Sequence, residues 1–435
     1  MSAKEKTPLI QKGPGFRSGL RDLPGAISGK SIAAGLIATI FGCTGPALVV
    51  MRAADAAGYT MEDKASWLFG IYVFGGAISI IMALYYKMPI NGAFSIPGAA
   101  MLISSLVGVP FNEAAGAFVM AGVIVLILGL TGIIGRIMRW LPIPIVMAMI
   151  AGAMIRFGTG IITSIFAKND AGQLDMQNFV IGIAAIIGFF LLPRFVKQIP
   201  PVIGATVLAV IAMIVTGVHF STEGIRYIPP RIVAPHFTLD GLLGVALPLA
   251  VLVIGAENSQ AIGVLIAQGY KPPINAMTII SGIGGIAAGL VGAHNANIAG
   301  PMTAICSSEA AGEDPDKRYA GSIVNGLTFG AFGLVGSLAV GVVNALPSSL
   351  VAILAGLAMV NVLIQAFQLA FSSKRFQVGT FFALVTASSG ITLFQIGSSF
   401  WALVFGVIVA FIVAPEDFKH REEENVALQE EAAAN

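Results

Sequence analysis

A succession of long apolar stretches, separated by short charged or Pro/Gly-rich breaks, runs from residue 31 to residue 414. A stretch of about 20 mostly apolar residues is long enough to cross the hydrocarbon core of a bilayer as a helix. Only 11% of the residues are charged, whereas a soluble domain carries about 25% charged residues. The sequence therefore predicts an all-α polytopic membrane protein and excludes a soluble multi-domain enzyme.

Fourteen such segments are predicted, seven in each half of the chain. They cover residues 31–52, 66–86, 89–106, 114–134, 141–162, 178–193 and 200–218, then 241–267, 273–292, 294–308, 319–342, 346–371, 377–394 and 398–414. The halves define two predicted seven-segment repeats, 31–218 and 241–414, joined by a more polar linker, 219–240. A basic tail, 1–30, precedes them, and an acidic, Ala-rich tail, 415–435, follows.

The distribution of lysine and arginine over the loops predicts the orientation of these segments, because cytoplasmic loops carry the excess of positive charge. If the amino terminus is cytoplasmic, eighteen of the 24 lysines and arginines fall on the cytoplasmic side. The six on the other side are Arg52, Lys64, Arg156, Lys168, Arg226 and Arg231. We therefore expect a multi-pass protein of the bacterial cytoplasmic (inner) membrane with both termini in the cytoplasm and the linker outside.

Short matches in a shared order relate the two halves at an offset of roughly 200 residues. The Leu-Pro pair at 141–142 recurs at 346–347, and the Gly-Gly pair at 75–76 recurs at 284–285. An odd number of segments per repeat places the second copy upside down in the membrane, which is the architecture of many secondary transporters. The sequence therefore predicts two inverted repeats.

The third and tenth segments are each broken at the centre by a proline beside a glycine. Proline fits the first turn of a helix but not its interior, so we expect extended stretches, 91–96 and 294–299, followed by half-helices that start near Pro97 and Pro301. Extended backbone at membrane depth is tolerated where protein encloses it or where it lines a cavity. The free N–H groups at a helix start attract an anion. The candidate substrate-binding residues here are Phe94, Ser95, Ile96, Pro97, Gly98, Asn295, Asn297 and Gly300. The alternative is a pair of kinked packing helices.

Glu257 is the only acidic residue that lies deep within a predicted segment, the eighth. A charged side chain at the bilayer centre costs about 2.5–3.5 kcal/mol, so such residues usually face a cavity. We therefore take Glu257 as the candidate for proton coupling. Gln260 lies one turn further on the same helix face and is a candidate substrate contact. The alternative is a permanently protonated acid that only bonds a neighbouring helix.

Two further groups are weaker candidates. His294 begins the tenth segment beside Asn295, and a histidine titrates near neutral pH, which makes His294 a second candidate for proton coupling. These side chains could equally serve only to satisfy open backbone. Thr44 lies in a Cys-Thr-Gly-Pro break of the first segment, at the position that matches the Glu257 region, and is a candidate substrate contact. A simple proline kink explains this break equally well.

Several classes of function have no signal in the sequence. A Gly-rich phosphate loop, the H-E-x-x-H motif and the spacing of zinc ligands are all missing, and the four histidines are scattered. We therefore expect no enzyme activity, no cofactor, no metal and no nucleic-acid partner.

Three short motifs in the third, eighth and tenth segments resemble those of the benzoate:proton symporter (BenE) family. The similar runs are S-x-P-G-A-A-M-L at 95–102, G-A-E-N-S-Q at 255–260 and H-N-A-N-I-A-G-P at 294–301, and the resemblance covers nearly the whole membrane region. It implies the seven-plus-seven inverted-repeat fold of nucleobase and sulfate transporters, with core and gate domains. In the related nucleobase carriers an acid of the eighth segment and polar residues of the tenth contact the ligand. Glu257 matches the first, but the tenth segment here lacks a second acid, which favours a substrate with its own negative charge.

The sequence thus predicts a secondary active transporter that takes up benzoate or a similar small aromatic carboxylate together with a proton. We expect the ring to lie against Phe94 and Phe41 and the carboxylate to lie at the half-helix ends. The alternatives are a nucleobase or other aromatic-metabolite symporter on the same fold, and an uncoupled anion channel. Membrane lipid surrounds the protein in this interpretation, and a homodimer is compatible with it.

Overall fold

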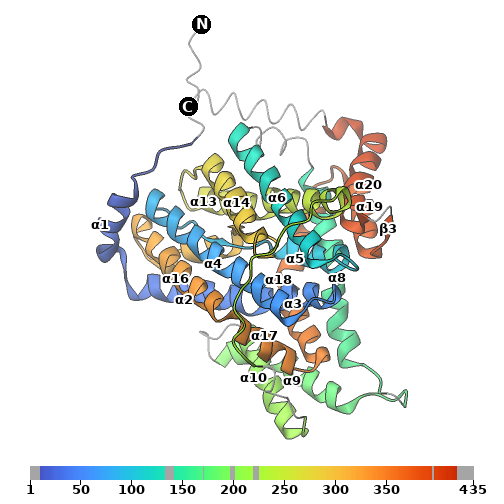
Figure 1. Ribbon diagram of the computed structural model, residues 1–435. Coiled ribbons are helices and arrows are strands. Elements are labelled where there is room, and N and C mark those ends of the chain that lie inside the picture. Colours follow the sequence, from blue (N-terminus) through green and yellow to red (C-terminus); the bar gives the residue numbers. More distant parts are fainter. Residues whose placement is uncertain are drawn as a thin grey trace.

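The computed structural model describes residues 10–132, 142–169, 171–195, 201–218, 225–393 and 396–418, and these are mostly helical (Figure 1). The first half contains α1 (Phe16–Ala26), α2 (Gly29–Cys43), α3 (Gly45–Ala56), α4 (Met61–Tyr86), β1 (Gly92–Ala93), α5 (Ile96–Ser105), α6 (Phe111–Thr131), α8 (Ile143–Ile165), α9 (Met176–Phe195) and α10 (Pro201–Val215). Most of the acidic tail, from residue 419 onward, lies outside the described residues.

The second half begins with one long helical stretch made of α11 (Leu239–Gly241), η1 (Leu242–Ala246), α12 (Leu247–Leu252), η2 (Val253–Asn258) and α13 (Ser259–Ala267). It continues with α14 (Ile274–Gly289), β2 (Asn297–Ile298), α15 (Gly300–Ser307), η3 (Glu309–Ala311), η4 (Pro315–Lys317), α16 (Tyr319–Leu334), α17 (Gly336–Ala345), α18 (Ser348–Phe371), α19 (Gln377–Ser389), β3 (Thr392–Leu393), β4 (Ile396–Gly397) and α20 (Ser398–Val413).

Every one of the fourteen predicted segments contains helix, but the helices differ in length. Six helical stretches of the described chain are long and apolar enough to cross a membrane, and there are up to eight if each of two bent pairs counts as one span. One bent pair is α16 with α17, at 65°. The chain is therefore a multi-pass membrane protein with several short or broken helices.

Small residues allow the helices to approach backbone to backbone. A Cβ added at Gly76 of α4 would lie 2.5 Å from the carbonyl oxygen of Gly326 in α16. A Cβ added at Gly122 of α6 would lie 2.5 Å from the backbone nitrogen of Ile286 in α14. Glycine permits this packing where lipid supplies no hydrophobic force between helices. An offset of seven predicted segments relates α4 to α14 and α6 to α16. The α4–α16 pair and the α6–α14 pair therefore occupy equivalent positions in the two halves.

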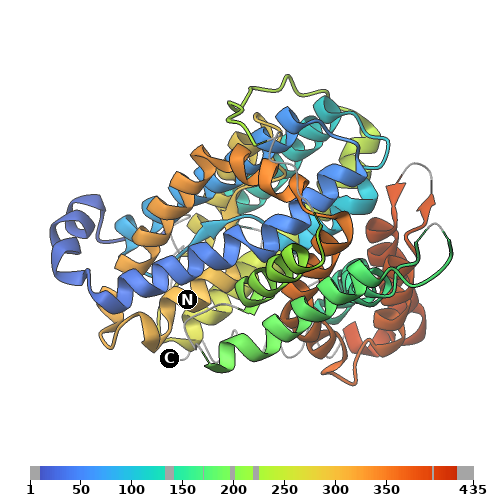
Figure 2. The same ribbon diagram turned by 90° about the horizontal axis from the view of Figure 1, so that it is seen from below.

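The helices form two groups. In one group, α2 and α4 pack against α16, and α6 packs against α14. In the other, α8 packs against α18 and α19, α9 packs against α10, and α19 packs against α20. Figures 1 and 2 show α1 at one side of the molecule and α19 and α20 at the opposite side. Helices α3 and α5 of the first group contact α18 and α8 of the second.

Residues 225–238 of the linker contain no helix and are held on the first group of helices. The backbone N–H of Arg231 donates to Ser66 Oγ of α4 (2.6 Å), and the Arg231 guanidinium forms an ion pair with Asp63. The His236 N–H donates to the carbonyl oxygen of Asn112 in α6 (2.9 Å). Residues 219–224 of the predicted linker lie outside the described residues.

The third and tenth segments meet as two short extended stretches at the centre of the first group. β1 and β2 pair antiparallel, with Gly92 opposite Ile298 and Ala93 opposite Asn297. Each stretch is followed by a short helix, α5 or α15, that carries proline in its first turn. The expected arrangement of an extended stretch and a half-helix is therefore present in both segments.

Candidate functional site

The two half-helices begin close together because β1 and β2 lie side by side. Ser95 caps α5, since its Oγ accepts a hydrogen bond from the Gly98 N–H (3.0 Å). The residue before α15, Ala299, has no side chain able to cap the helix. The first N–H groups of a helix have no partner within it and carry partial positive charge. The remaining donors of both half-helices therefore need an acceptor from elsewhere.

Glu257 supplies that acceptor to both half-helices. Its Oε1 accepts from the Ile96 N–H at the start of α5 (3.1 Å), and its Oε2 accepts from the Gly300 N–H at the start of α15 (3.3 Å). The side chain is almost completely buried. One carboxyl group thus occupies the place where the sequence predicted the anion of a substrate.

A π-helical turn, η2, carries Glu257 to this position. The wider turn spans Val253–Asn258, and the Ser259 hydroxyl donates to the carbonyl oxygen of Ile254 five residues earlier (2.8 Å). Single π-helical turns inside α-helices are frequent at functional sites. Here the turn places Glu257 and Asn258 against the extended stretches of the other two segments.

His294 and Asn295 hold the backbone of Ser95 from both sides. Asn295 Oδ1 accepts from the Ser95 N–H (3.1 Å), and His294 Nε2 lies 3.0 Å from the Ser95 carbonyl oxygen. His294 Nδ1 accepts from the indole N–H of Trp67 (2.9 Å). Because an indole only donates, Nδ1 is unprotonated and the proton is on Nε2. His294 is therefore a neutral imidazole with both nitrogens paired.

Several amide groups around the half-helix starts are buried without a partner. Asn258 Nδ2, Asn295 Nδ2 and Asn297 Oδ1 have no hydrogen bond within the described protein. An unpaired buried donor or acceptor costs about 1–3 kcal/mol. These groups are therefore available to a water molecule or to a polar ligand group at the site.

The other predicted residues lie around this centre in different ways. Phe94 is fully buried and packs edge-on against Tyr72 (5.9 Å) and His294 (5.7 Å). Gln260 is exposed, and a Cβ added at Gly300 would lie 2.4 Å from its Oε1. The Thr44 hydroxyl donates to the carbonyl oxygen of Ile40 (2.8 Å), within the break between α2 and α3.

The site of Ser95, Ile96, Glu257, His294, Asn295 and Gly300 is closed in this conformation, because all six residues are buried. Trp67 and the pair of Asn258 and Ser281 also contact this site, although no motif in the sequence predicts them. The Ser281 hydroxyl lies 3.1 Å from Asn258 Oδ1 and accepts from the Ile298 N–H (3.0 Å). Among the described residues, no three His, Cys, Asp or Glu side chains are placed to hold a metal ion.

Sequence comparisons match this chain to membrane proteins over most of its length. The family model described as benzoate membrane transport protein matches residues 25–412. The inner membrane protein YdcO of Escherichia coli is 30% identical over 382 residues, which are 88% of this chain and 95% of that protein. The benzoate membrane transport protein of Acinetobacter baylyi is 25% identical over 389 residues, 87% and 94% of the two chains.

Structural comparison identifies the fold. The transmembrane domain of the cyanobacterial bicarbonate transporter BicA superposes with a TM-score of 0.60 at 16% identity, covering 93% of this chain and 99% of that one. The murine anion transporter Slc26a9 in its inward-facing state gives a TM-score of 0.63 at 15% identity, covering 94% and 73%. At these identities the likeness establishes a shared fold.

Proposed function

This chain belongs to the family of benzoate membrane transport proteins, and on that premise we propose that it takes up benzoate or a similar small aromatic carboxylate together with a proton. Its family makes it a membrane transporter and not an enzyme. The observation that carries the proposal is the position of Glu257, whose carboxyl oxygens accept from the Ile96 and Gly300 N–H groups.

Competition for these two N–H groups couples the proton to the anion. While Glu257 is ionised, it occupies the donors, and a second carboxylate beside it is repelled. Protonation removes the negative charge and weakens the acceptor, so the substrate carboxylate takes over the N–H groups. When the proton leaves on the other side of the membrane, the Glu257 carboxylate returns to the donors and displaces the substrate. Proton and anion move together, and the step is electrically neutral.

The site must open for substrate to reach it, and the two groups of helices supply the moving parts. We propose that the halves are inverted repeats. Two observations support this: β1 and β2 pair antiparallel, and the α4–α16 contact has an equivalent in the α6–α14 contact. Rocking of one group against the other around a fixed midplane site is how such repeats give alternating access. In the open state the substrate ring would lie against Phe94 and Phe41.

Two alternatives each have an observation in their favour. The unpaired amides of Asn295 and Asn297 suit a ligand with both donors and acceptors, such as a nucleobase. The fold shared with bicarbonate and other anion transporters suits an uncoupled anion pathway. Both use the same half-helix starts, so substrate choice and coupling must be measured.

The direct test is uptake of labelled benzoate by proteoliposomes under an imposed pH gradient. The proposal expects accumulation that requires an acidic exterior, is abolished by a protonophore, and is accompanied by faster exchange when benzoate is present inside. Accumulation of uracil in place of benzoate would favour the nucleobase carrier. Benzoate flux without accumulation or exchange stimulation would favour the channel.

A further inference from the structure

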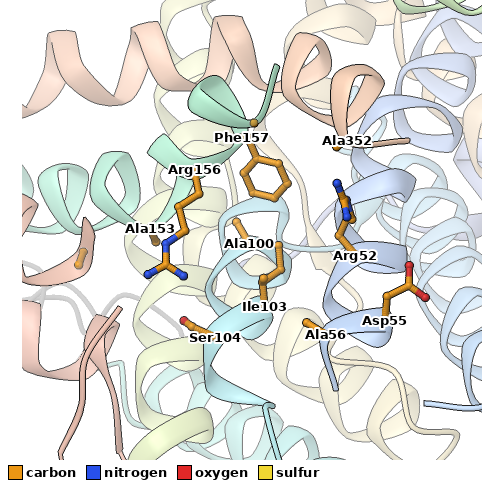
Figure 3. A pocket seen from close by; sticks show the side chains of 12 residues that line it. Arg52, Asp55, Ala56, Ala100, Ile103, Ser104, Ala153, Arg156, Phe157 and Ala352 are labelled. Atoms are coloured by element: carbon orange, nitrogen blue, oxygen red, sulfur yellow. The ribbon is translucent and has the colours of Figure 1, made fainter. Parts of the chain in front are cut away.

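A second cavity lies between the two groups of helices, apart from the closed site at Glu257. It has a volume of about 400 Å³ and is lined from α3, α5, α8, α18 and α19 (Figure 3). One of its lining residues on α5 is Ala100, four residues after Ile96. At 1.5 Å of rise per residue, this is about 6 Å along the helix from the N–H group that Glu257 holds.

The charged groups of this cavity are mainly positive. Arg52 of α3 and Arg156 of α8 lie on opposite sides of it (Figure 3). The one acid in the lining, Asp55, forms an ion pair with Lys64 (2.5 Å). Neither arginine forms a salt bridge with any residue of the described chain. Asp55 also interacts electrostatically with Arg52, so the cavity contains two guanidinium groups and one carboxylate that is shared with Lys64.

The remaining walls are mostly apolar. Phe157, Ala100 and Ile103 lie between the two arginines in Figure 3, and Phe157 is largely buried. The acids Glu113 and Asp240 line a neighbouring cavity of about 280 Å³, which shares Ser104 with the first. Pockets for small molecules typically measure about 300–1,000 Å³ and combine apolar walls with a few polar groups. An aromatic ring with one carboxylate matches both the size and the charge of the Arg52–Arg156 cavity.

We propose that this cavity is an access site, where a small aromatic carboxylate binds before it moves along α5 to Glu257. The guanidinium groups bind the carboxylate, and Phe157 contacts the ring. Positive charge in a cleft with low-dielectric walls raises the local concentration of an anion and its association rate. This inference rests on the proposed function for the identity of its ligand.

The kinetic test compares Arg52→Gln and Arg156→Gln with Arg226→Gln in uptake of labelled benzoate. Arg226 is an exposed arginine that faces Glu62 of α4 and does not line the cavity. Each cavity variant should raise KM by about tenfold, the size expected for loss of one charge-assisted hydrogen bond. The rate at saturating benzoate should stay close to that of the wild type. An unchanged KM in both cavity variants would overturn the access site.

A second experiment reads the cavity without transport. Ala153 lines it and does not line the neighbouring cavity of Glu113 and Asp240, so an Ala153→Cys variant, made with Cys43→Ala, reports reaction with an anionic and with a neutral thiol reagent. The two arginines should make the anionic reagent react about tenfold faster than the neutral one, and benzoate should protect the thiol from reaction. The additional Arg52→Gln and Arg156→Gln changes should remove both effects.

The two experiments separate the two proposals. If benzoate protects the thiol but is not accumulated, the access site stands and proton-coupled uptake fails. If benzoate is accumulated while protection and the reagent preference are missing, uptake stands and the access site fails. If benzoate neither protects nor is accumulated, both proposals are wrong.

Discussion

At the scale of single residues, Glu257 connects three segments that are far apart in the sequence. Its two oxygens accept from Ile96 and Gly300, which start half-helices in different halves of the chain. The sequence alone predicts Glu257 as a candidate, because an acid within an apolar segment is costly and rare. Its partners were predicted as a separate anion site, because no local pattern shows that a side chain of the eighth segment reaches both half-helices.

Glu257→Gln tests this residue as the coupling group. The amide is uncharged at every pH, so it imitates the protonated acid permanently. We expect benzoate binding and benzoate–benzoate exchange to persist and accumulation driven by a pH gradient to disappear, as measured in proteoliposomes. Glu113→Gln, which changes an acid that bonds Thr238 away from the half-helix starts, should accumulate benzoate normally. Full accumulation by Glu257→Gln would move coupling elsewhere, with His294 next to be tested.

Trp67 shows what sequence reasoning could not find. A tryptophan near the start of a membrane segment is usual at the lipid interface, so nothing marked it as a partner of His294. Its N–H fixes the His294 tautomer that bonds Ser95. Trp67→Phe should leave a buried acceptor unpaired at a cost of about 1–3 kcal/mol.

The loss of stability in Trp67→Phe is measured as a lower Tm of the protein in detergent. The matched control is Trp401→Phe at an exposed hydrogen bond to Leu393, and this variant should unfold close to the wild-type temperature. Equal Tm values for Trp67→Phe and the wild type would contradict a structural role for the Trp67–His294 bond.

At the scale of elements, the half-helices were predictable from the sequence, and the π-helical turn that contains Glu257 was not. Proline beside glycine marked the extended stretches and the helix starts in both segments, because proline belongs in a first turn. The turn at Val253–Asn258 contains one more residue than an α-helical turn. The surrounding sequence is apolar throughout, so no change in its pattern predicts this extra residue. The pairing of β1 with β2 was also missed, since two-residue strands leave no alternation in a sequence.

Gly300→Leu tests whether the start of α15 binds the substrate. A Cβ at this position already meets the Gln260 side chain at 2.4–2.6 Å, so a leucine side chain would crowd the N–H group. We expect the variant to insert normally and to lose benzoate binding, measured by calorimetry on purified protein. Gly263→Leu, at an exposed position with open space around it, should bind normally. Wild-type affinity in Gly300→Leu would mean that the break is a packing feature.

At the scale of the whole molecule, the segment pattern predicted a multi-pass helical membrane protein, and the comparisons confirm its family. The fourteen crossings stay a prediction, because six helical stretches in the described chain meet the criterion of a single long span. A short helix such as α15, most of which is buried, is tolerated where protein rather than lipid surrounds the backbone. Helix α1 within the basic tail was not predicted.

The orientation of the molecule remains a prediction from its loop charges. Reporter fusions at Lys30 and Asn435 should both give a cytoplasmic signal, because positive loops stay inside. Lys30 pairs with Glu313 (2.8 Å) and Asp22 with Lys87 (2.9 Å), so the start of α2, the end of α4 and the loop before α16 share one face. A periplasmic signal from either fusion would contradict an even number of crossings with both ends inside.

The bridge that Glu257 makes between the half-helices also means that the resting protein contains its own competitive inhibitor. A tethered carboxylate acts at a high effective concentration, so a free carboxylate must outcompete it or wait for its protonation. One proton is taken up by Glu257 for each anion that binds. The apparent Kd for benzoate should therefore rise about tenfold for each pH unit over the range in which Glu257 is ionised, whereas Glu257→Gln should bind equally well throughout that range. Titrations of both proteins at several pH values would measure this inhibition directly.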